Sequence, residues 1–348
     1  MAAPFLKVKK TAVVILNWNG AELLSQFLPG VEQHSLGAAI YVVDNASTDK
    51  SVAYVRSKHP QVHLIVLDRN YGFAEGYNRG LASIEADIYV LLNSDVEVTP
   101  GWLEPVLSIF ETNQNVAACQ PKILDWKNKS QFEHAGAAGG YVDKNGFMFC
   151  AGRIFNSFEE DHGQYDSDRE VFWASGACLF VRADLYEAAG GLDPDFFAHM
   201  EEIDLCWRLK NMGYTIWAAG QSKVYHIGGA SLHMQHPYKV FLNFRNNLFL
   251  LTKNYNYSPL LPRLLTRMIL DGVAAFKFLT EGKPRFFLAV FKAHFHFYLA
   301  LRGMLRKRKA RTLRKPNKVG LYSGSIVADF FLRGKKSFHD LDPQKFEY

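Results

Sequence analysis

Residues 11–20 read TAVVILNWNG, and residues 40–49 read IYVVDNASTD. Each segment begins with an unbroken run of β-branched and other apolar residues, which is typical of a strand buried on both faces. Each run ends in polar side chains, with Asn17 closing the first and Asp44 the second. Between them, residues 21–34 have apolar side chains at helical spacing. The two segments therefore predict a strand–helix–strand unit.

The same alternation continues along the chain. Further strands are expected at residues 62–67 and 88–92, with one helix that follows Asp49 and runs to about Lys58 and another that follows Gly76 and runs to about Glu85. Repeated alternation of this kind predicts an α/β fold with a mostly parallel, Rossmann-like sheet covered by helices on both faces. Ligands bind such sheets at the carboxyl ends of the strands. The polar residues at these ends are therefore the first candidates for a binding site.

The second half of the chain departs from this regular pattern. Residues 125–168 are polar, aromatic and Gly-rich, which predicts a long excursion from the sheet that contains hairpins. Loops of this length in a compact domain often belong to an active site or bind an acceptor. Residues 238 onward are expected to be mostly helical. The other expected elements are a helix at 100–113, strands at 117–124, 172–181, 214–218 and 222–226, and helices at 182–189 and 201–212.

Two polar strand ends suggest nucleotide and metal binding. Asp44 is placed to read a ribose or a base, or else to act as a turn residue. The first strand is followed by NWNG rather than GxGxxG, which excludes a dinucleotide fold of the NAD type. Asn93 and Asp95 stand two apart on a turn, and oxygen side chains in this arrangement can chelate Mn²⁺ or Mg²⁺. Ser47 and Asp49 are expected to cap the helix that follows them and runs to about Lys58.

A third acidic group opens the helix at 201–212, where Glu201, Glu202 and Asp204 crowd the first turn. One interpretation is favourable interaction with the helix dipole, and Asp204 can also pair with Arg208 one turn later. The other is a general base that takes a proton from an acceptor hydroxyl. His226 ends a strand, and by itself it reads more readily as a structural histidine than as a ligand.

Seven motifs occur in order over residues 11–232 and together resemble family 2 glycosyltransferases of the GT-A fold, especially the rhamnosyltransferase-like branch. They are VVILNWNG, VVDNASTD, NYGFAEGYNRG, LLNSDVEV, WASGACLFVR, MEEIDLCWRL and VYHIGGASL. The resemblance implies a nucleoside diphosphate sugar donor, such as a UDP- or dTDP-sugar, and a Mn²⁺ or Mg²⁺ ion. It also implies an inverting displacement at C1 of the sugar.

The resemblance assigns roles to individual residues. Asn93 and Asp95 fall on the DxD metal motif, Glu202 falls on the catalytic base, and His226 matches a histidine that ligates the metal in some relatives. The residues implied to bind the nucleotide, donor sugar and acceptor are Asn17, Asn19, Asp44, Asn45, Asn70, Gly72, Phe73, Asn78, Trp173, Ala174, Ser175 and Gly176. Arg245 in NFRNN is a further candidate, because it could reach a phosphate of the donor or the acceptor.

Two residues depart from the family pattern. Asn93 replaces the first acid of DxD, and Glu202 replaces an Asp, with Glu201 and Asp204 as rival bases. These departures leave open a non-catalytic relative that binds sugar nucleotides or glycans. A nucleotidyltransferase is disfavoured, because NWNGAE is not a Gly-rich loop bearing Arg or Lys.

The remainder of the chain suggests a membrane surface as partner. We expect a catalytic domain at residues 1–235 and a helical, basic region at 236–348. Residues 277–318 contain thirteen Lys and Arg against one acid, Glu281. With the apolar residues at 286–305, this pattern predicts an amphipathic helix at an anionic membrane, or else a helical region packed on the catalytic body. The aromatic residues form no stacking platform for nucleic acid. Four separated cysteines fit a reducing, cytoplasmic compartment. The basic region would then place the protein on the inner face of the membrane.

Overall fold

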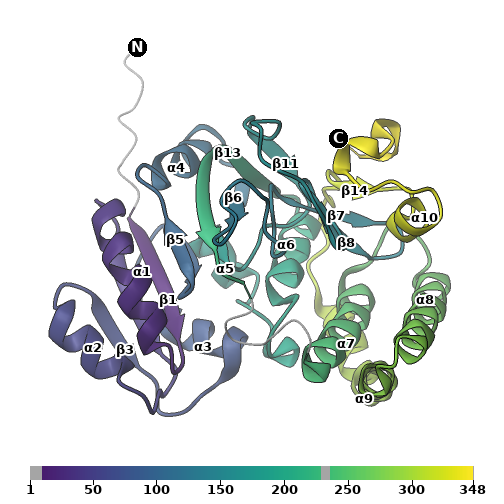
Figure 1. The fold of residues 1–348 in the computed structure, drawn as a ribbon, viewed down its shortest axis with the longest axis horizontal. Helices are drawn as coiled ribbons and strands as arrows, with labels where there is room; N and C mark the ends of the chain where they lie inside the picture. The colour runs from purple at the N-terminus through teal and green to yellow at the C-terminus, as the bar shows by residue number, and fades with distance from the viewer. Residues whose placement is uncertain (1–9, 229–235, 348) are drawn as a thin grey trace.

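The computed structural model describes residues 10–228 and 236–347, and its centre is a large β-sheet (Figure 1). Within these residues the strand order is β11-β13-β6-β12-β4-β1-β2-β3, and β5 pairs with β13. The first four strands in sequence pair in parallel. They are β1 (Thr11–Asn17), β2 (Ala39–Asp44), β3 (His63–Val66) and β4 (Ile88–Asn93). The helices that connect them are α1 (Ala21–His34), α2 (Ser51–Lys58) and α3 (Gly72–Leu81).

The sheet continues beyond β4 with strands of both directions. β12 runs antiparallel to both β4 and β6, so β6 has the direction of β4, and β13 is parallel to β6. β11 and β5 run antiparallel to β13. The predicted mostly parallel α/β sheet is therefore confirmed. These strands are β5 (Val96–Val98), β6 (Val116–Asp125), β11 (Arg169–Val171), β12 (Cys178–Arg182) and β13 (Thr215–His226).

Buried side chains on both faces of the sheet form two apolar cores. In β1, Ala12 and Val14 belong to one core, whereas Val13 and Ile15 belong to the other. This division follows from the alternation of side chains along a strand. It explains why the strand sequence is apolar throughout, and why helices lie on both faces. α4 (Leu103–Thr112), α5 (Ala183–Ala188) and α6 (Glu201–Asn211) complete the two helical layers.

A second, smaller sheet is built from the predicted excursion and the end of the chain. Its order is β10-β9-β8-β7-β14, and its first strands form the expected hairpins. The strands are β7 (Gly140–Asp143), β8 (Met148–Cys150), β9 (Arg153–Ile154), β10 (Ser157–Phe158) and β14 (Leu321–Tyr322). β14 pairs in parallel with β7. The end of the chain is thus less uniformly helical than the sequence predicted, because it contributes this strand to the sheet.

Three long helices precede β14 and lie at the end of the molecule opposite α2 and β3 (Figure 1). They are α7 (Pro237–Asn254), α8 (Leu260–Thr280) and α9 (Pro284–Ala310); α10 (Ile326–Phe331) follows β14. The boundary proposed at residue 235 and the final residues of VYHIGGASL lie outside the described residues. Among the residues described, no helix has the length and apolar character needed to cross a membrane.

Two local predictions were wrong, and one strand was not predicted. The two strands expected at 214–218 and 222–226 form one strand, β13, with an irregularity between Ala219 and Lys223. Only the end of the predicted strand at 172–181 is extended in the sheet, as β12. β5 was not predicted, because three residues carry too little periodicity. Its antiparallel pairing with β13 places Val96 opposite His226.

Candidate active site

The carboxyl ends of β1 and β2 join two loops that the sequence marked as nucleotide-binding. Asn17 and Asp44 are paired in register, and the Asn17 amide donates to Asp44 Oδ1 at 3.0 Å and to Ser47 Oγ at 3.2 Å. Asp44 Oδ2 accepts from the Ser47 N–H. Both Asn17 and Asp44 are buried, at 1% exposure. In this structure their side chains therefore hold the loop in shape.

Asn19 completes the connection between these loops. Its backbone has a left-handed φ of 50°, and its side-chain oxygen accepts from the Thr48 N–H at 2.7 Å. The predicted capping of α2 by Ser47 and Asp49 is not found, because the N-cap residue of α2 is Lys50. Ser47 bonds instead to the Asn17 side chain and the Asn19 backbone. Asp49 is not at the N-cap position, but its carboxylate accepts backbone N–H groups at the starts of both α1 and α2.

A third loop, residues 67–73, packs beside this pair. The Asn45 amide donates to Asn70 Oδ1 and to the Gly72 carbonyl, at 3.0 and 2.9 Å. Gly72 has φ 76°, and a Cβ there would lie 2.8 Å from the Phe197 ring. The Phe73 N–H donates to the Phe197 carbonyl. The loop is therefore connected to the segment that leads into α6.

Asn78 lies farther along α3 and has different partners. Its amide donates to the Leu192 carbonyl at 2.8 Å, and its oxygen accepts from the Leu192 N–H and the Tyr186 hydroxyl. These bonds fix α3 to the chain before residue 193. The predicted nucleotide contact of Asn78 is thus replaced, in this structure, by internal bonds.

The metal candidates Asn93, Asp95 and His226 do converge. His226 Nε2 lies 3.1 Å from Asp95 Oδ1 and 3.4 Å from the Asn93 amide nitrogen. The β5–β13 pairing brings these residues together across 131 positions of sequence. On its other side, His226 Nδ1 lies 3.3 Å from a carboxylate oxygen of Glu133, which sequence reasoning missed. Glu133 comes from the irregular excursion, where no motif marks it.

Two neighbouring carboxylates favour the protonated form of His226. Burial alone lowers the pKa of His226, but its contacts with Asp95 and Glu133 outweigh burial and raise the pKa to about 10. A ring that ligates a metal must first release that proton. Within residues 10–228 and 236–347, no group of three His, Cys, Asp or Glu is placed to hold a metal unaided. One carboxylate, one imidazole and one amide oxygen fit a divalent cation as a partial ligand set that donor phosphates would complete.

The segment 173–177 bridges the metal candidates to α6. The Asn93 N–H donates to the Ala177 carbonyl at 3.0 Å. A Cβ on Gly176 would lie 3.5 Å from the Glu202 side chain, so the two residues are in contact. Ser175 is held by a bond from its N–H to Gln120. Trp173 is buried and donates to the Tyr141 carbonyl, so it supports the segment from the side of the second sheet.

The three acidic candidates on α6 have different environments. One carboxylate oxygen each of Glu201 and Glu202 is buried without a hydrogen-bond partner among the described residues. Burial raises the pKa of both carboxyls, and the neighbouring charge of Glu202 raises that of Glu201 further. Glu201 is buried, whereas Glu202 is partly exposed beside Gly176. Glu202 is therefore the one of these two residues that is partly exposed, and one oxygen of its carboxylate has no hydrogen-bond partner among the described residues.

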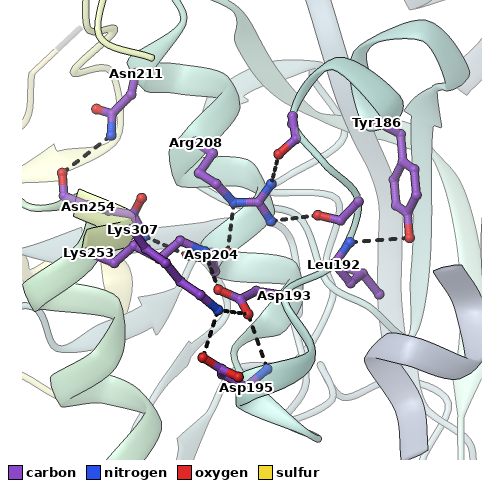
Figure 2. A network of polar contacts seen from close by, with 12 residues as sticks. Tyr186, Leu192, Asp193, Asp195, Asp204, Arg208, Asn211, Lys253, Asn254 and Lys307 are labelled. Carbon is purple, nitrogen blue, oxygen red and sulfur yellow. Dashed lines mark hydrogen bonds and ion pairs between the residues drawn. The ribbon is translucent and has the colours of Figure 1, made fainter. Parts of the chain in front are cut away.

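Asp204, in contrast, is saturated by a buried network that Figure 2 shows. Its Oδ2 lies 2.8 Å from both Arg208 Nε and Lys253 Nζ, and its Oδ1 accepts from the Asn254 amide. Burial raises the pKa of Asp204, but the charges of Arg208 and Lys253 outweigh it and lower the pKa. The geometry thus gives Asp204 a structural place between α6 and α7.

The segment before α6 is strained and is held from α7. Phe197, His199 and Met200 all have left-handed φ values, of 64°, 68° and 73°. The Asn246 amide donates to three carbonyls of this segment, those of residues 196, 198 and 199. Arg245, which was expected to reach a phosphate, donates instead to the carbonyls of residues 195 and 196. The NFRNN segment marked Arg245 as a candidate, but the sequence did not indicate that Asn246 holds the segment before α6.

The profile of a known protein family, glycosyl transferase family 2, matches residues 12–186, about half of the chain. The chain belongs to glycosyl transferase family 2. An N-acetylglucosaminyl-diphospho-decaprenol L-rhamnosyltransferase of Mycobacterium tuberculosis is 25% identical, over 62% of this chain and 75% of that protein. The dTDP-rhamnosyl transferase RfbF of Shigella flexneri is 25% identical, over 62% and 71%. These relatives agree with the predicted rhamnosyltransferase-like branch of the family.

Solved structures agree with the predicted GT-A fold of the family. GalNAc-T7 with UDP, GalNAc and Mn²⁺ superposes with a TM-score of 0.56 at 14% identity, covering 72% of this chain. This chain spans about half of that protein, 48%. A mannosyltransferase of Pyrobaculum calidifontis, in complex with GDP-Man and Mn²⁺, gives a TM-score of 0.51 at 14% identity, covering 88% and 87% of the two chains. At these identities the likeness concerns the fold.

Proposed function

We propose that this family 2 glycosyltransferase moves a sugar, with inversion, from a nucleoside diphosphate sugar to a hydroxyl of a glycan or lipid-linked glycan precursor. The observation that carries the proposal is the position of Glu202. The residue is partly exposed, and its side chain contacts Gly176, whose neighbour Ala177 accepts a hydrogen bond from the Asn93 N–H at the metal candidates. The catalytic base and the site for the leaving diphosphate would thus both lie against residues 176–177.

The donor would bind at the carboxyl ends of β1, β2 and β4. The loops that begin at Asn17 and Asp44 are fixed to each other, and Trp18 on the first loop is 57% exposed, which leaves its ring open to a base. The names of the relatives favour a dTDP-sugar as donor and a lipid-linked acceptor. A UDP-sugar is the other candidate, because the solved structure of GalNAc-T7 contains UDP. The protein would then act at the cytoplasmic face of a membrane, as a peripheral enzyme of cell-envelope polysaccharide synthesis.

Mn²⁺ or Mg²⁺ would be held by Asp95, the oxygen of Asn93 and His226, together with the donor phosphates. Bound there, such a cation would neutralise charge on the departing diphosphate. The Asn93 amide can present its oxygen in place of its nitrogen by rotating half a turn. The presence of a single carboxylate in the set supports binding of the cation together with the donor.

Glu202 would act on the acceptor. Its carboxylate accepts the proton of the acceptor hydroxyl as the hydroxyl oxygen attacks C1 of the sugar from the face opposite the phosphate. The bond from C1 to the phosphate oxygen breaks, and the nucleoside diphosphate leaves with the electron pair. Because burial raises the pKa of Glu202, its carboxylate is a stronger base than an exposed glutamate.

A matched pair of variants tests this role. Glu202→Gln should lower transfer from dTDP-rhamnose or a UDP-sugar to an N-acetylglucosaminyl-diphospho-lipid by roughly 10²–10⁴-fold. Its thermal shift with donor and Mn²⁺ should equal that of the wild type. Glu201→Gln, which removes the adjacent buried charge, should retain most of the activity. Normal turnover by Glu202→Gln would remove it from the role, and a wild type that binds donors without turnover would indicate a non-catalytic relative.

Metal binding is tested separately by thermal shift. The nucleoside diphosphate of the donor should raise the melting temperature more with Mn²⁺ than without it, because a ligand stabilises the state that binds it. Asp95→Asn should abolish the difference that the metal makes. An equal shift with and without Mn²⁺ would argue against a cation held by Asp95.

A further inference from the structure

The helices α8 and α9 carry large apolar side chains on the side that faces away from the protein. Joined by residues 281–283, they form an antiparallel pair in which His294 contacts Asp271. The exposed apolar residues, each more than half exposed, are Leu261, Leu265, Ile269, Val273, Phe276, Leu288, Phe291, Phe295, Tyr298 and Leu299. We call these residues the α8–α9 face.

Packing within the chain does not explain this face. The sides of α8 and α9 that are buried consist of other residues, including Leu264 and Ala275 on α8 and Val290 and Phe297 on α9. Each helix is therefore apolar on two sides. A monomeric protein rarely leaves so many large apolar side chains together in water, and such patches mark interaction sites.

The exposed side chains of the two helices form one surface. Phe276 of the face contacts the ring of Phe287 on α9, with centroids 6.0 Å apart. Tyr298 of the face donates to Met268 on α8. The two apolar stripes therefore meet along the seam between the helices.

Basic side chains follow the apolar stripe along the same side of α9. Leu288, Phe295 and Leu299 are succeeded by Arg302 and Arg306, at intervals that keep them on one helical face. Arg302, Arg306 and Lys309 are exposed, and no ion pair to them is found in the described part of the chain. At the other end of the stripe, Lys283 and Arg285 are exposed beside the turn.

A groove lies where the apolar and basic parts of α9 meet. It has a volume of about 860 Å³ and is lined by Tyr298, Leu301 and Leu305 together with Arg302, Arg306 and Lys309. Arg308 and Arg311 also line it, and they are fixed by bonds to the carbonyls of α7 and Tyr255. An apolar floor with cations around it suits an anionic head group attached to an apolar chain.

We propose that the α8–α9 face and its basic groove bind the surface of an anionic lipid bilayer. The apolar side chains enter the boundary between head groups and acyl chains, and the arginines take the lipid phosphates. A second copy of the chain is a poorer occupant, because a symmetric contact through this face would bring the basic groups of two copies together. The row of basic side chains along α9 is thus complementary to an anionic lipid surface rather than to a second copy of itself.

This surface is physically connected to the candidate active site. Lys307 of α9 bonds to Asp193 and Asp195 at 2.5 and 2.7 Å, directly before the strained segment that leads to Glu202 (Figure 2). Docking on a bilayer would hold the site at a fixed height above the lipid. The purpose of docking rests on the proposed function, whereas the binding itself does not and is measured without donor.

The test is flotation of the full chain with vesicles of phosphatidylcholine alone or mixed with phosphatidylglycerol. The wild type should float with the mixed vesicles and lose binding as salt is raised. Arg302→Gln with Arg306→Gln and Lys309→Gln should weaken binding on the order of 100-fold, since each cation near the surface contributes about fivefold. Lys50→Gln with Arg56→Gln and Lys58→Gln removes equal charge from α2 and should change little.

The apolar part is tested in the same assay. Phe291→Ser with Phe295→Ser should abolish flotation, whereas Leu36→Ser, at an exposed position just after α1, should not. All five side chains altered on α9 are exposed, so melting temperatures should be preserved. Glu202→Gln should float like the wild type even if transfer is lost. Failure of the wild type to bind mixed vesicles, or a dimer in solution that the serine variant separates, would overturn the proposal.

Discussion

Replacing Lys253 with methionine tests whether the network of Figure 2 fastens α7 to the catalytic body. Lys253 Nζ lies 2.6 Å from Asp193 Oδ2 and 2.8 Å from Asp204 Oδ2, and all three side chains are buried. Removal of one partner from a buried ion pair leaves an uncompensated charge and costs about 3–5 kcal/mol. Lys253→Met should therefore reduce the free energy of unfolding at pH 7 by an amount in this range, measured with urea.

The pH dependence sharpens the prediction. Burial raises the pKa of Asp193, but Lys253 and Lys307 outweigh burial and lower it from 3.8 to about 2. A group whose folded-state pKa is lowered stabilises the protein above its unfolded-state pKa, and this stability is lost as the pH falls through the folded-state value. The shift corresponds to about 2 kcal/mol at pH 7. The difference in the free energy of unfolding between the wild type and Lys253→Met should therefore decrease as the pH falls from about 4 toward 2.

A surface pair provides the control. Lys129 lies 2.5 Å from a carboxylate oxygen of Glu97, but its side chain is 48% exposed. Exposed pairs contribute about 0–1 kcal/mol, so Lys129→Met should change the free energy of unfolding by no more than that. The reasoning is refuted if Lys253→Met costs less than about 1 kcal/mol at pH 7, or if its cost is the same at pH 7 and pH 3.

Three further predictions concern the site. Asn246→Ala should lower the free energy of unfolding by about 1–3 kcal/mol and kcat more than KM, because buried carbonyls of the strained segment lose their donor; urea unfolding and steady-state kinetics measure this. Gly72→Ala should lower the melting temperature, because the alanine would have to adopt a left-handed φ of 76° and its Cβ would lie 2.8 Å from the Phe197 ring; an unchanged melting curve would contradict this. In a pH profile of kcat/KM, activity should decrease as the pH is lowered, because Glu202 then gains a proton. The midpoint of this decrease should lie above pH 4.5, because burial raises the pKa of Glu202.

The elements that the sequence predicted well are those whose evidence is local. The apolar run at residues 11–16 and the helical spacing at 21–34 each lie within one element, and β1 and α1 follow them closely. The convergence of Asn17 with Asp44 was also predictable, because parallel neighbouring strands bring their carboxyl ends to one edge. The family motifs added the ligands expected at these residues, but not the contacts that the residues make within the chain.

The tertiary structure alone decided which acidic side chains remain available. Glu202 and Asp204 stand two positions apart, and the residues alone left both as candidates for the base. Asp204 is neutralised by Lys253, 49 positions away, while Glu202 faces Gly176. In the same way, Glu133 reaches His226, and α8 and α9 show which of their two apolar sides stays uncovered. Burial and long-range pairing set these outcomes, because they depend on which distant segments the fold brings together.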